Sequence, residues 1–423
     1  MGRDTIDRHL RLMKGSIRLP AFMPDATYGY VRSAGWADVR KAGVECVVMN
    51  AYHLATKAGT GPIGAMGGVG AYTGWGGPVL TDSGGFQVLS LIGKDARHGT
   101  VRDEGITFRP GNGEKVLLTP EKSVRSQLAF GSDVIMCLDH CDGPGDARDA
   151  VARSVERTLG WARRCKDEYA RAVGAMGAEG PRPLLFAIVQ GGADMGLRER
   201  CAAGLASMGF DGYGFGGWPL DGKGRFLDGT LAYAASLMPD GALKYAMGVG
   251  RPDEVVRCHA MGYDLFDCVI PTREARRKRL YVFTDGWESA LRSYMEGAKE
   301  RLRRMREEGA WGLGAAGDAD GSDGGARPRG GRGGDGGAWP MGPHEGEGRP
   351  FYSIHHAEDD KYARDASPVS GLCDCELCLG YGKAFLRHMF RMGEPSAMRL
   401  ATIHNLRFYA TLMGQLQRMP DDG

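Results

Sequence analysis

Short, largely apolar runs recur along the first two thirds of the chain. Each is six or seven residues long, too short for a buried helix. Unbroken runs of this kind are typical of strands that are buried on both faces of a parallel sheet. The eight runs are AFMPDA (21–26), VECVVMN (44–50), PVLTDS (78–83), DVIMCLD (133–139), LLFAIVQ (184–190), GYGFGG (212–217), KYAMGV (244–249) and LFDCVI (265–270).

Longer stretches with helical periodicity lie between most of these runs, among them residues 147–172, 194–208 and 252–262. Eight strands that alternate with helices over roughly 250 residues are the pattern of a (β/α)8 barrel. A polar stretch, TFRPGNGEKVLLTP (107–120), predicts a hairpin inserted after the third strand. The predicted fold class is therefore α/β, a (β/α)8 TIM barrel with an inserted hairpin.

Residues 309–349 differ from the rest in composition. They contain GLGAAGDADGSDGGARPRGGRGGDGGAWP, and glycine this dense cannot bury a core. We predict a flexible surface insertion. An alternative is that its Arg-Gly-Gly pieces, at Arg329 and Arg332, touch RNA.

Composition and charge limit the classes of function. The 423 residues include 54 Lys+Arg and 52 Asp+Glu, a net charge of +2. A nearly neutral chain is not a general nucleic-acid coat, so any nucleic-acid site must be a local basic patch. No apolar run reaches the ~18 residues that span a bilayer, and no secretory signal is visible. We therefore expect a cytoplasmic protein with no membrane partner.

Polar residues end several of the predicted strands. A single aspartate after a strand is usually a helix cap. Carboxylates, a glutamine and glycine pairs gathered at the same end of a barrel instead indicate a site, because barrel enzymes keep their active sites there. The strand ends are Thr81-Asp82-Ser83-Gly84-Gly85, Asp139, Gln190-Gly191-Gly192, Gly216-Gly217 and Asp267.

Three cysteines cluster in the pattern Cys373-x-Cys375-x2-Cys378. In a cytosolic protein such a cluster indicates a metal before it indicates disulfides, although free or redox cysteines are the alternative. A closed tetrahedral site needs a fourth ligand, for which we expect His404. A Cys3His set leaves no open position, so the expected ion is one structural Zn²⁺ per chain. The competing histidines are His388, His355 and His356.

These features divide the chain into three parts. Residues 1–308 are expected to form the catalytic barrel, residues 309–349 the glycine-rich insertion, and residues 350–423 a zinc-binding C-terminal subdomain.

Several motifs together resemble the tRNA-guanine transglycosylase (queuine tRNA-ribosyltransferase) family, and its bacterial branch most closely. The resemblance covers about residues 8–308 and 350–415, and the order and spacing of the motifs match. The motifs are TDSGGFQ (81–87), LDHC (138–141), IVQGG (188–192), GFDGYGFGG (209–217), MGVG (247–250), FDCVIPTR (266–273), CDCELC (373–378) and IHNLRFY (403–409).

The resemblance implies base exchange at the ribose C1′ of the wobble guanosine in a tRNA anticodon loop. Breaking an N-glycosidic bond creates an oxocarbenium-like centre, and two carboxylates with separate roles suit that chemistry. The family assigns the nucleophile to Asp267, which would hold the sugar covalently. It assigns the general acid/base to Asp82.

Further positions match the family's base pocket. Asp139 would accept from the N1–H and 2-amino groups of the base, while Gln190 and the backbone N–H of Gly217 would address O6. Phe86 and Met247 would sandwich the planar ring. The remaining expected contacts are Ser83, Cys141 and Trp218, with Asn50 and His53 lining or bracing the pocket.

A basic run follows the nucleophile in PTREARRKR (271–279). Arg273 and Arg276 are expected to bind phosphates and neighbouring bases of RNA, and Arg277, Lys278 and Arg279 add positive charge. The base must leave the anticodon stack to reach the pocket. The resemblance also implies a homodimer.

The sequence departs from the family pattern after Gly217, where Trp218-Pro219-Leu220-Asp221-Gly222 replaces the usual Leu-Ala-Val-Gly-Glu. The Trp218 carbonyl can still accept from an aminomethyl group, but Pro219 has no N–H to donate. His140 replaces a common acidic residue. The leading interpretation is incorporation of the 7-deazaguanine preQ1.

Other functions fit parts of the same evidence. The closest alternatives are the same chemistry with queuine or on DNA. A non-catalytic tRNA-binding subunit is another, but it should lack one of the two aspartates. A barrel oxidoreductase is disfavoured because no G-x-G-x-x-G follows a strand.

Overall fold

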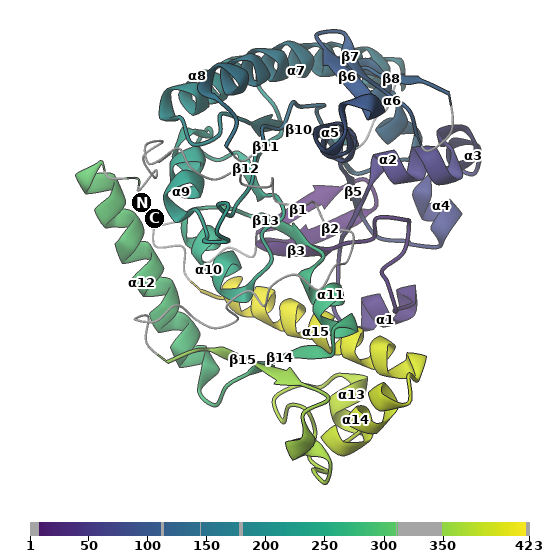
Figure 1. The fold of residues 1–423 in the computed structure, drawn as a ribbon, viewed down its shortest axis with the longest axis vertical. Helices are drawn as coiled ribbons and strands as arrows, with labels where there is room; N and C mark the ends of the chain where they lie inside the picture. Colours follow the sequence, from purple (N-terminus) through teal and green to yellow (C-terminus); the bar gives the residue numbers. More distant parts are fainter. Residues whose placement is uncertain are drawn as a thin grey trace.

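The computed structural model describes residues 8–110, 114–143, 145–176, 181–309, 311 and 349–419. Its centre is a parallel sheet with the strand order β3-β13-β12-β11-β10-β9-β5-β4 (Figure 1). A parallel bridge between Asp25 and Val48 joins the two edge strands and closes the sheet into a barrel. The barrel strands are β3 (Ala21–Pro24), β4 (Val47–Met49), β5 (Val79–Thr81), β9 (Val134–Met136), β10 (Leu184–Val189), β11 (Gly212–Phe215), β12 (Leu243–Ala246) and β13 (Leu265–Cys268).

Seven of the eight strands fall inside the predicted runs and β12 begins one residue earlier, at Leu243, so the predicted fold class is confirmed. Strand β10 shows why the apolar runs are unbroken. Phe186 and Ile188 point into the barrel interior, whereas Leu185, Ala187 and Val189 pack against the surrounding helices. Both faces of the strand are dry, so neither face needs polar side chains.

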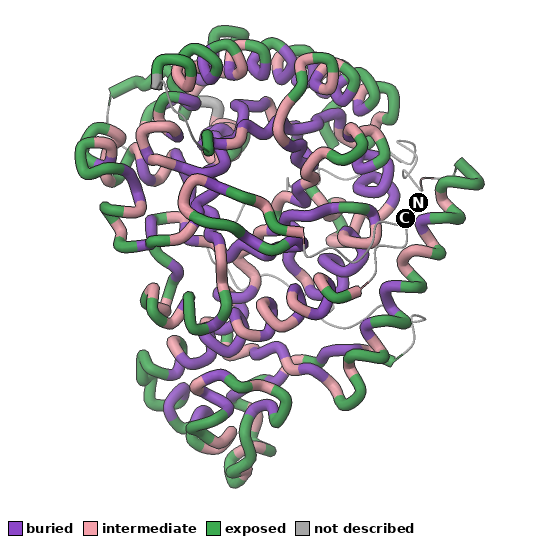
Figure 2. Tube along the Cα trace, turned by 180° about the vertical axis from the view of Figure 1, so that it is seen from behind, coloured by how far each residue is buried: buried purple, intermediate pink, exposed green. Residues whose placement is uncertain are grey.

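Helices surround the barrel, with their outer faces exposed and the strands buried (Figure 2). The three predicted helices correspond to α7 (Arg148–Met176), α8 (Met195–Met208) and α10 (Pro252–Ala260). The main helices around the barrel are α1 (Trp36–Lys41), α6 (Pro120–Ala129), α7 (Arg148–Met176), α8 (Met195–Met208), α9 (Asp228–Leu237), α10 (Pro252–Ala260) and α11 (Ile270–Arg276). Shorter helices follow β4 and β5, namely α2 (Ala51–His53), α3 (Thr60–Ala65), α4 (Val69–Thr73) and α5 (Gly85–Lys94), with the π-helix η1 (Leu54–Ala58).

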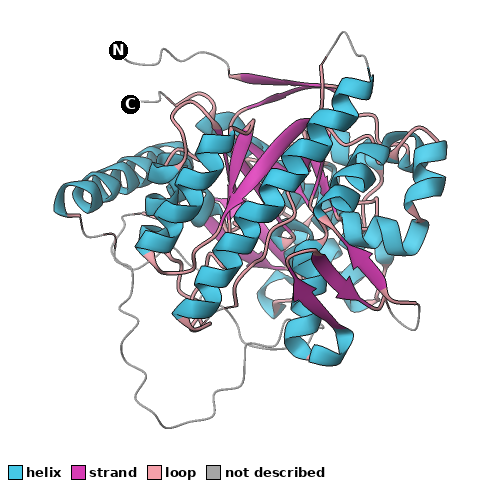
Figure 3. Cartoon of the chain, turned by 90° about the horizontal axis from the view of Figure 1, so that it is seen from above, coloured by secondary structure: helices cyan, strands magenta, loops and turns pink. Residues whose placement is uncertain are grey.

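An antiparallel hairpin of β1 (His9–Leu12) and β2 (Gly15–Arg18) covers the amino-terminal end of the barrel (Figure 3). Leu12 and Ile17 complete the core inside the barrel. The backbone N–H of Lys14 donates to Asp133, the residue that precedes β9, at 2.8 Å. This end is therefore closed, and a site can form only at the other.

The insertion after the third barrel strand is a three-stranded antiparallel sheet rather than a simple hairpin. The predicted pair is β7 (Gly105–Phe108) and β8 (Val116–Leu118), and β6 (Gly99–Arg102) pairs with β7 on its other side. The prediction of an inserted hairpin is confirmed, and the sequence analysis missed the additional strand.

The C-terminal segment packs closely on the barrel. Strand β14 (Arg279–Phe283) pairs with β15 (Tyr352–His356), and α12 (Trp287–Glu308) lies between them in sequence. Helices α13 (Glu376–Gly380) and α14 (Lys383–Arg391) precede α15 (Pro395–Leu416), whose Phe408 and Tyr409 belong to the same core as the barrel strands. The glycine-rich insertion lies outside the described residues, apart from its ends.

Candidate active site

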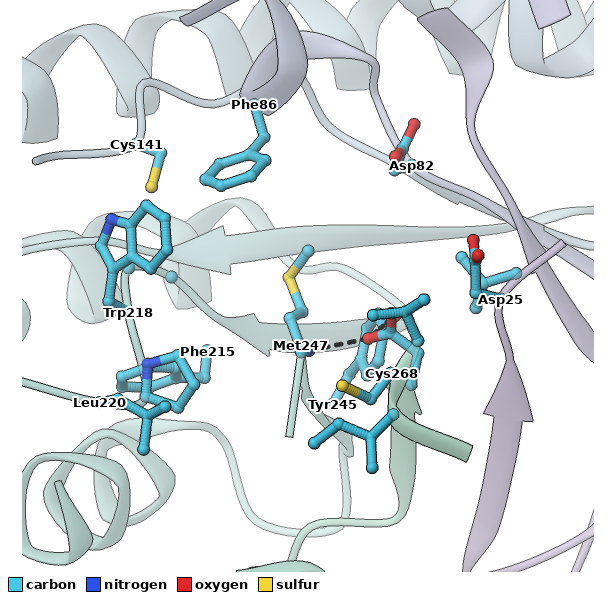
Figure 4. A pocket seen from close by; sticks show the side chains of 18 of the residues that line it. Asp25, Asp82, Phe86, Cys141, Phe215, Trp218, Leu220, Tyr245, Met247 and Cys268 are labelled. Carbon is cyan, nitrogen blue, oxygen red and sulfur yellow. Dashed lines mark hydrogen bonds between the residues drawn. The ribbon is translucent and has the colours of Figure 1, made fainter. Parts of the chain in front are cut away.

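A cavity of about 620 Å³ opens at the carboxyl ends of the barrel strands. Figure 4 shows it extending from Cys141 and Trp218 at one end to Asp25 and Asp82 at the other, with Phe86 and Met247 between them. Eleven residues expected at the site line it, so the folding of the chain brings these sequence-distant positions together. They are Asp82, Ser83, Phe86, Asp139, Cys141, Gln190, Gly217, Trp218, Met247, Asp267 and Arg273.

Asp82 is half-buried after strand β5, and hydrogen bonds hold both of its oxygens. Asn50 Nδ2 donates to Oδ2 at 2.7 Å, and the N–H groups of Ala51 and Gly84 donate to Oδ1 at 2.9 and 3.0 Å. Burial raises the pKa of Asp82 to about 7 despite these N–H groups, and the nearby carboxylate of Asp267 adds to the rise. A carboxyl with this pKa can give up or take a proton near neutrality.

Asp267 lies at the end of β13, also half-buried. The hydroxyl of Tyr245 donates to its Oδ1 at 2.7 Å and the N–H of Gly248 donates to the same atom at 2.8 Å. Burial raises the pKa of Asp267, and these two donors oppose the rise because they favour the carboxylate. The second oxygen, Oδ2, accepts from no described residue. The anion is thus oriented with one oxygen held and the other available.

Asp139 and Gln190 form a buried pair at the opposite end of the cavity. Gln190 Nε2 donates to Asp139 Oδ2 at 2.6 Å, and burial raises the pKa of Asp139 to about 6. Gln190 Oε1 is buried and has no partner among the described residues. A buried acceptor without a partner costs free energy, which a ligand N–H can recover.

The loops that follow β10 and β11 are held from behind by Arg198. Its side chain is 2% exposed and donates to the carbonyls of Gly192, Val189 and Gly216 at 2.7, 3.2 and 3.2 Å. A Cβ atom at Gly191 would come within 2.6 Å of the backbone nitrogen of Arg198, and Gly217 has a φ of +101°. These contacts explain why glycines occupy both loops.

The two expected base-stacking residues lie on different elements and leave a gap between them. Phe86, on α5, is 41% exposed and contacts Trp218 edge-on at 5.6 Å between ring centroids. Met247 follows β12 on the facing side (Figure 4). Both side chains line the cavity, where their apolar surfaces could contact a planar aromatic ligand.

The loop around Pro219 turns Asp221 away from the cavity. Asp221 accepts from the backbone N–H groups of Lys223 and Arg225 and from the Arg225 side chain at 2.7 Å. It stabilises its own loop and does not line the pocket. The carbonyl of Trp218 accepts from no described residue.

The basic run is only partly at the cavity. Arg273 lines it, and Arg276 is half-buried with its Nη1 lacking a partner among the described residues. Arg277 is exposed, 3.8 Å from Glu274. Lys278 instead forms a 2.6 Å ion pair with Glu358 of the C-terminal segment. Arg276, Arg277 and Lys278 do not line the cavity.

A second cluster lies in the C-terminal segment, where the ligand atoms of Cys373, Cys375, Cys378 and His404 are all within 4.8 Å of one another. His404 Nδ1 is 3.5 and 3.3 Å from two of the thiols, and its Nε2 contacts the carbonyl of Tyr281 at 2.8 Å. This second contact leaves Nδ1 free to bind an ion. The cluster could hold a metal ion.

The competing histidines are placed elsewhere. His388 is exposed on α14 near Phe385, His356 is exposed, and His355 is buried against Tyr362. Asn405, next to His404, ties α15 to the barrel by donating to the carbonyls of Pro271 and Arg279.

Several site residues were missed from the sequence. Tyr245 and Arg198 carry no local signal, because their partners are distant in the chain. Asp25 is different, since it directly follows the first barrel strand and lines the cavity. The strand-end rule used for the other strands would have found it.

The fold and the site define a (β/α)8-barrel enzyme whose pocket places two carboxylates of different environment around one ligand space. The family model of queuine tRNA-ribosyltransferase matches residues 8–419. The queuine tRNA-ribosyltransferase of Novosphingobium aromaticivorans is 33% identical over 98% of this chain and 91% of its own length. That of Idiomarina loihiensis is 34% identical over 97% of this chain and 88% of its own length. The chain therefore belongs to the queuine tRNA-ribosyltransferase family of tRNA-guanine transglycosylases and is a pentosyltransferase, which confirms the resemblance.

No helix in the described part of the chain is long and apolar enough to cross a membrane.

Proposed function

We propose that this enzyme exchanges the wobble guanine of a tRNA anticodon loop for a 7-deazaguanine, preQ1, through a covalent aspartyl-ribose intermediate. The observation that carries the proposal is the pair Asp82 and Asp267, which face one cavity with different hydrogen-bond partners. Two carboxylates that face one pocket in different environments suit separate acid/base and nucleophilic roles.

In the first half of the reaction, the free Oδ2 of Asp267 attacks C1′ of the ribose. The bond between C1′ and N9 breaks, its electron pair goes to the purine, and Asp82 donates a proton to the departing guanine. Tyr245 and Gly248 hold the attacking carboxylate in place. In the second half, Asp82 takes the N9 proton of the incoming base, which attacks C1′ and releases Asp267.

The other end of the cavity is suited to the base. Asp139 accepts from the N1–H and 2-amino groups of the base. The amide of Gln190 and the backbone N–H of Gly217 lie at the adjacent O6 edge. Phe86 and Met247 enclose the ring faces, with Ser83 and Cys141 beside them. The free carbonyl of Trp218 accepts from the aminomethyl group of preQ1.

Cationic side chains of the run that follows β13 provide the contacts to RNA. Arg273 lines the cavity, and the half-buried Arg276 has one guanidinium nitrogen without a partner among the described residues. We assign both to phosphates and flanking bases, with Arg277 and Lys278 as weaker contributors because they already lie near Glu274 and Glu358.

The Cys3His cluster holds a structural Zn²⁺. A tetrahedral zinc with bonds of about 2.3 Å to sulfur and 2.0–2.1 Å to nitrogen separates these atoms by about 3.6 Å. The separations of 3.5 and 3.3 Å between His404 Nδ1 and the thiols fit that geometry. The ion would link the loop of Cys373 to α15 and so stabilise the C-terminal segment.

We also propose a cytoplasmic homodimer. Large apolar side chains are exposed within residues 372–392, with Leu379 76% and Met392 67% exposed. Exposed apolar side chains in such number mark an interaction surface. The set is Leu372, Leu379, Tyr381, Phe385 and Met392.

The test is exchange of labelled guanine into tRNA. We expect label to enter wild-type reactions, preQ1 to chase it out, and a tRNA adduct to appear on denaturing gels. Asp267→Asn should lower the rate by about 10⁴-fold and abolish the adduct. Asp285→Asn, an exposed carboxylate outside the cavity, is the matched control. Undiminished exchange by Asp267→Asn would reject the mechanism.

A further inference from the structure

Asp25 is a further carboxylate that lines the cavity, and no part of the mechanism above uses it. It follows β3, which pairs in parallel with β13 so that Asp267 lies opposite Met23. Asp25 is thus two residues beyond that pair, towards the mouth. On its other side it bridges to Val48 of the β4 strand. Thr27 and Val48 line the same end of the cavity.

One carboxylate oxygen of Asp25 accepts hydrogen bonds within the protein, and the other is available to a ligand. Oδ1 accepts from the backbone N–H of Thr27 at 3.0 Å and from the Thr27 hydroxyl. No described residue donates to Oδ2. Figure 4 shows the carboxyl group directed into the space beside Asp82, at the end of the cavity farthest from Cys141 and Trp218.

No described cation pairs with this carboxylate. Arg276 is near enough that Asp25 opposes the fall in its pKa, yet no ion pair joins the two side chains. The unpartnered oxygen is open to the cavity, so a hydroxyl or N–H of a ligand there can form a charge-assisted hydrogen bond to it.

The position of the sugar follows from the position of the nucleophile. With the base between Phe86 and Met247 and C1′ at Asp267, the ribose must occupy the end that Asp25, Thr27 and Val48 line. The 2′-hydroxyl is carried by C2′, the atom bonded to C1′, and is therefore the sugar hydroxyl nearest to the attacking oxygen. Hydroxyl contacts of this kind distinguish RNA from DNA.

We propose that Asp25 accepts a hydrogen bond from the ribose 2′-hydroxyl of the nucleotide whose base is exchanged, and so selects RNA over DNA. This inference rests on the proposed base exchange and adds a specificity-determining residue to it. The negative charge of Asp25 also acts on Asp82 and Asp267, but that effect is the same for ribose and deoxyribose.

The experiment compares two synthetic anticodon stem-loops that differ only in ribose or 2′-deoxyribose at the exchanged guanosine. Asp25→Asn keeps an oxygen for Thr27 and replaces the free acceptor by an NH2 group. We expect the ribose-to-deoxyribose ratio of kcat/KM to fall by about tenfold in this variant, as for loss of one hydrogen bond to a charged acceptor. Asp25→Ala should lower the ratio similarly.

Two controls fix the interpretation. Asp240→Asn, an exposed carboxylate, should keep the wild-type ratio. When the deoxyribose is placed at the next nucleotide instead, Asp25→Asn should leave the ratio of kcat/KM values for the all-ribose and the substituted stem-loop unchanged. If Asp25→Asn slows both stem-loops by the same factor, Asp25 acts only through its charge and the inference is overturned. If the wild-type enzyme exchanges guanine in neither stem-loop, the proposed function itself fails.

Discussion

The hydroxyl of Tyr245 donates a 2.7 Å hydrogen bond to Oδ1 of Asp267, from the strand next to it in the barrel. This contact orients the carboxylate and stabilises its charge in a site whose burial favours the neutral form. The proposed nucleophile is therefore oriented by a neighbour that lies 22 residues away in sequence.

Tyr245→Phe removes this donor and should raise the pKa of Asp267 further. Because the nucleophile must be ionised, the acidic limb of the pH profile of kcat/KM should move to higher pH. The rate at mildly acidic pH should fall by about tenfold, the equivalent of one pKa unit. Tyr263→Phe removes a buried hydroxyl that donates to Leu231 and should leave the profile unchanged. An unmoved limb in Tyr245→Phe would contradict the role given to this contact.

Asp82 should determine the alkaline limb. Burial, with help from the charges of Asp267 and Asp25, raises its pKa to about 7, so the protonated acid is lost as pH rises through that value. kcat/KM should therefore fall above about pH 7. Asp82→Asn should lower the rate by about 10²–10⁴-fold and abolish the limb. A limb that persists at the same pH in this variant would assign it to another group.

Arg198→Met should weaken binding of the base, although Arg198 does not line the cavity. Its loss leaves the carbonyls of Val189, Gly192 and Gly216 without a buried donor and frees the two glycine loops. We expect the KM for guanine to rise by about tenfold or more while the KM for tRNA changes little. Arg200→Met on the same helix removes only an exposed pair with Glu156 and is the matched control. Equal changes in both KM values would indicate a general folding defect.

The Cys3His cluster should make stability depend on metal. His404→Ala should bind no ion, whereas wild type should carry one zinc per chain by mass spectrometry. Loss of a structural metal is among the few changes that exceed about 4 kcal/mol, so the thermal midpoint should fall clearly. His388→Ala removes an exposed histidine of the same segment and should change neither quantity. Full metal content in His404→Ala would point to another fourth ligand.

Leu379→Lys should weaken the proposed dimer, because it places a charge in the most exposed apolar position of residues 372–392. Light scattering at increasing dilution should show monomers at concentrations where wild type is dimeric. Met195→Lys, at a partly exposed site on α8, should keep the wild-type mass. A wild-type protein that is monomeric at all concentrations would refute the dimer.

The sequence predicted the barrel because both faces of each strand are dry, so every strand appears as a short apolar run. It also predicted many of the residues that line the cavity. Aspartates, a glutamine and glycine pairs follow those runs, and parallel strands end together. The spacing of the three cysteines predicted a metal cluster because these residues are close together in the sequence.

The tertiary structure decided which residues meet. It placed His404, rather than His388, His355 or His356, with its ligand atom within 4.8 Å of the three thiols, and its Nε2 contacts the Tyr281 carbonyl. It also paired Tyr245 with Asp267, set Arg198 behind both glycine loops, and left one oxygen of Asp25 open to the cavity. These contacts join segments far apart in the chain, and local periodicity and spacing carry no information about such pairs.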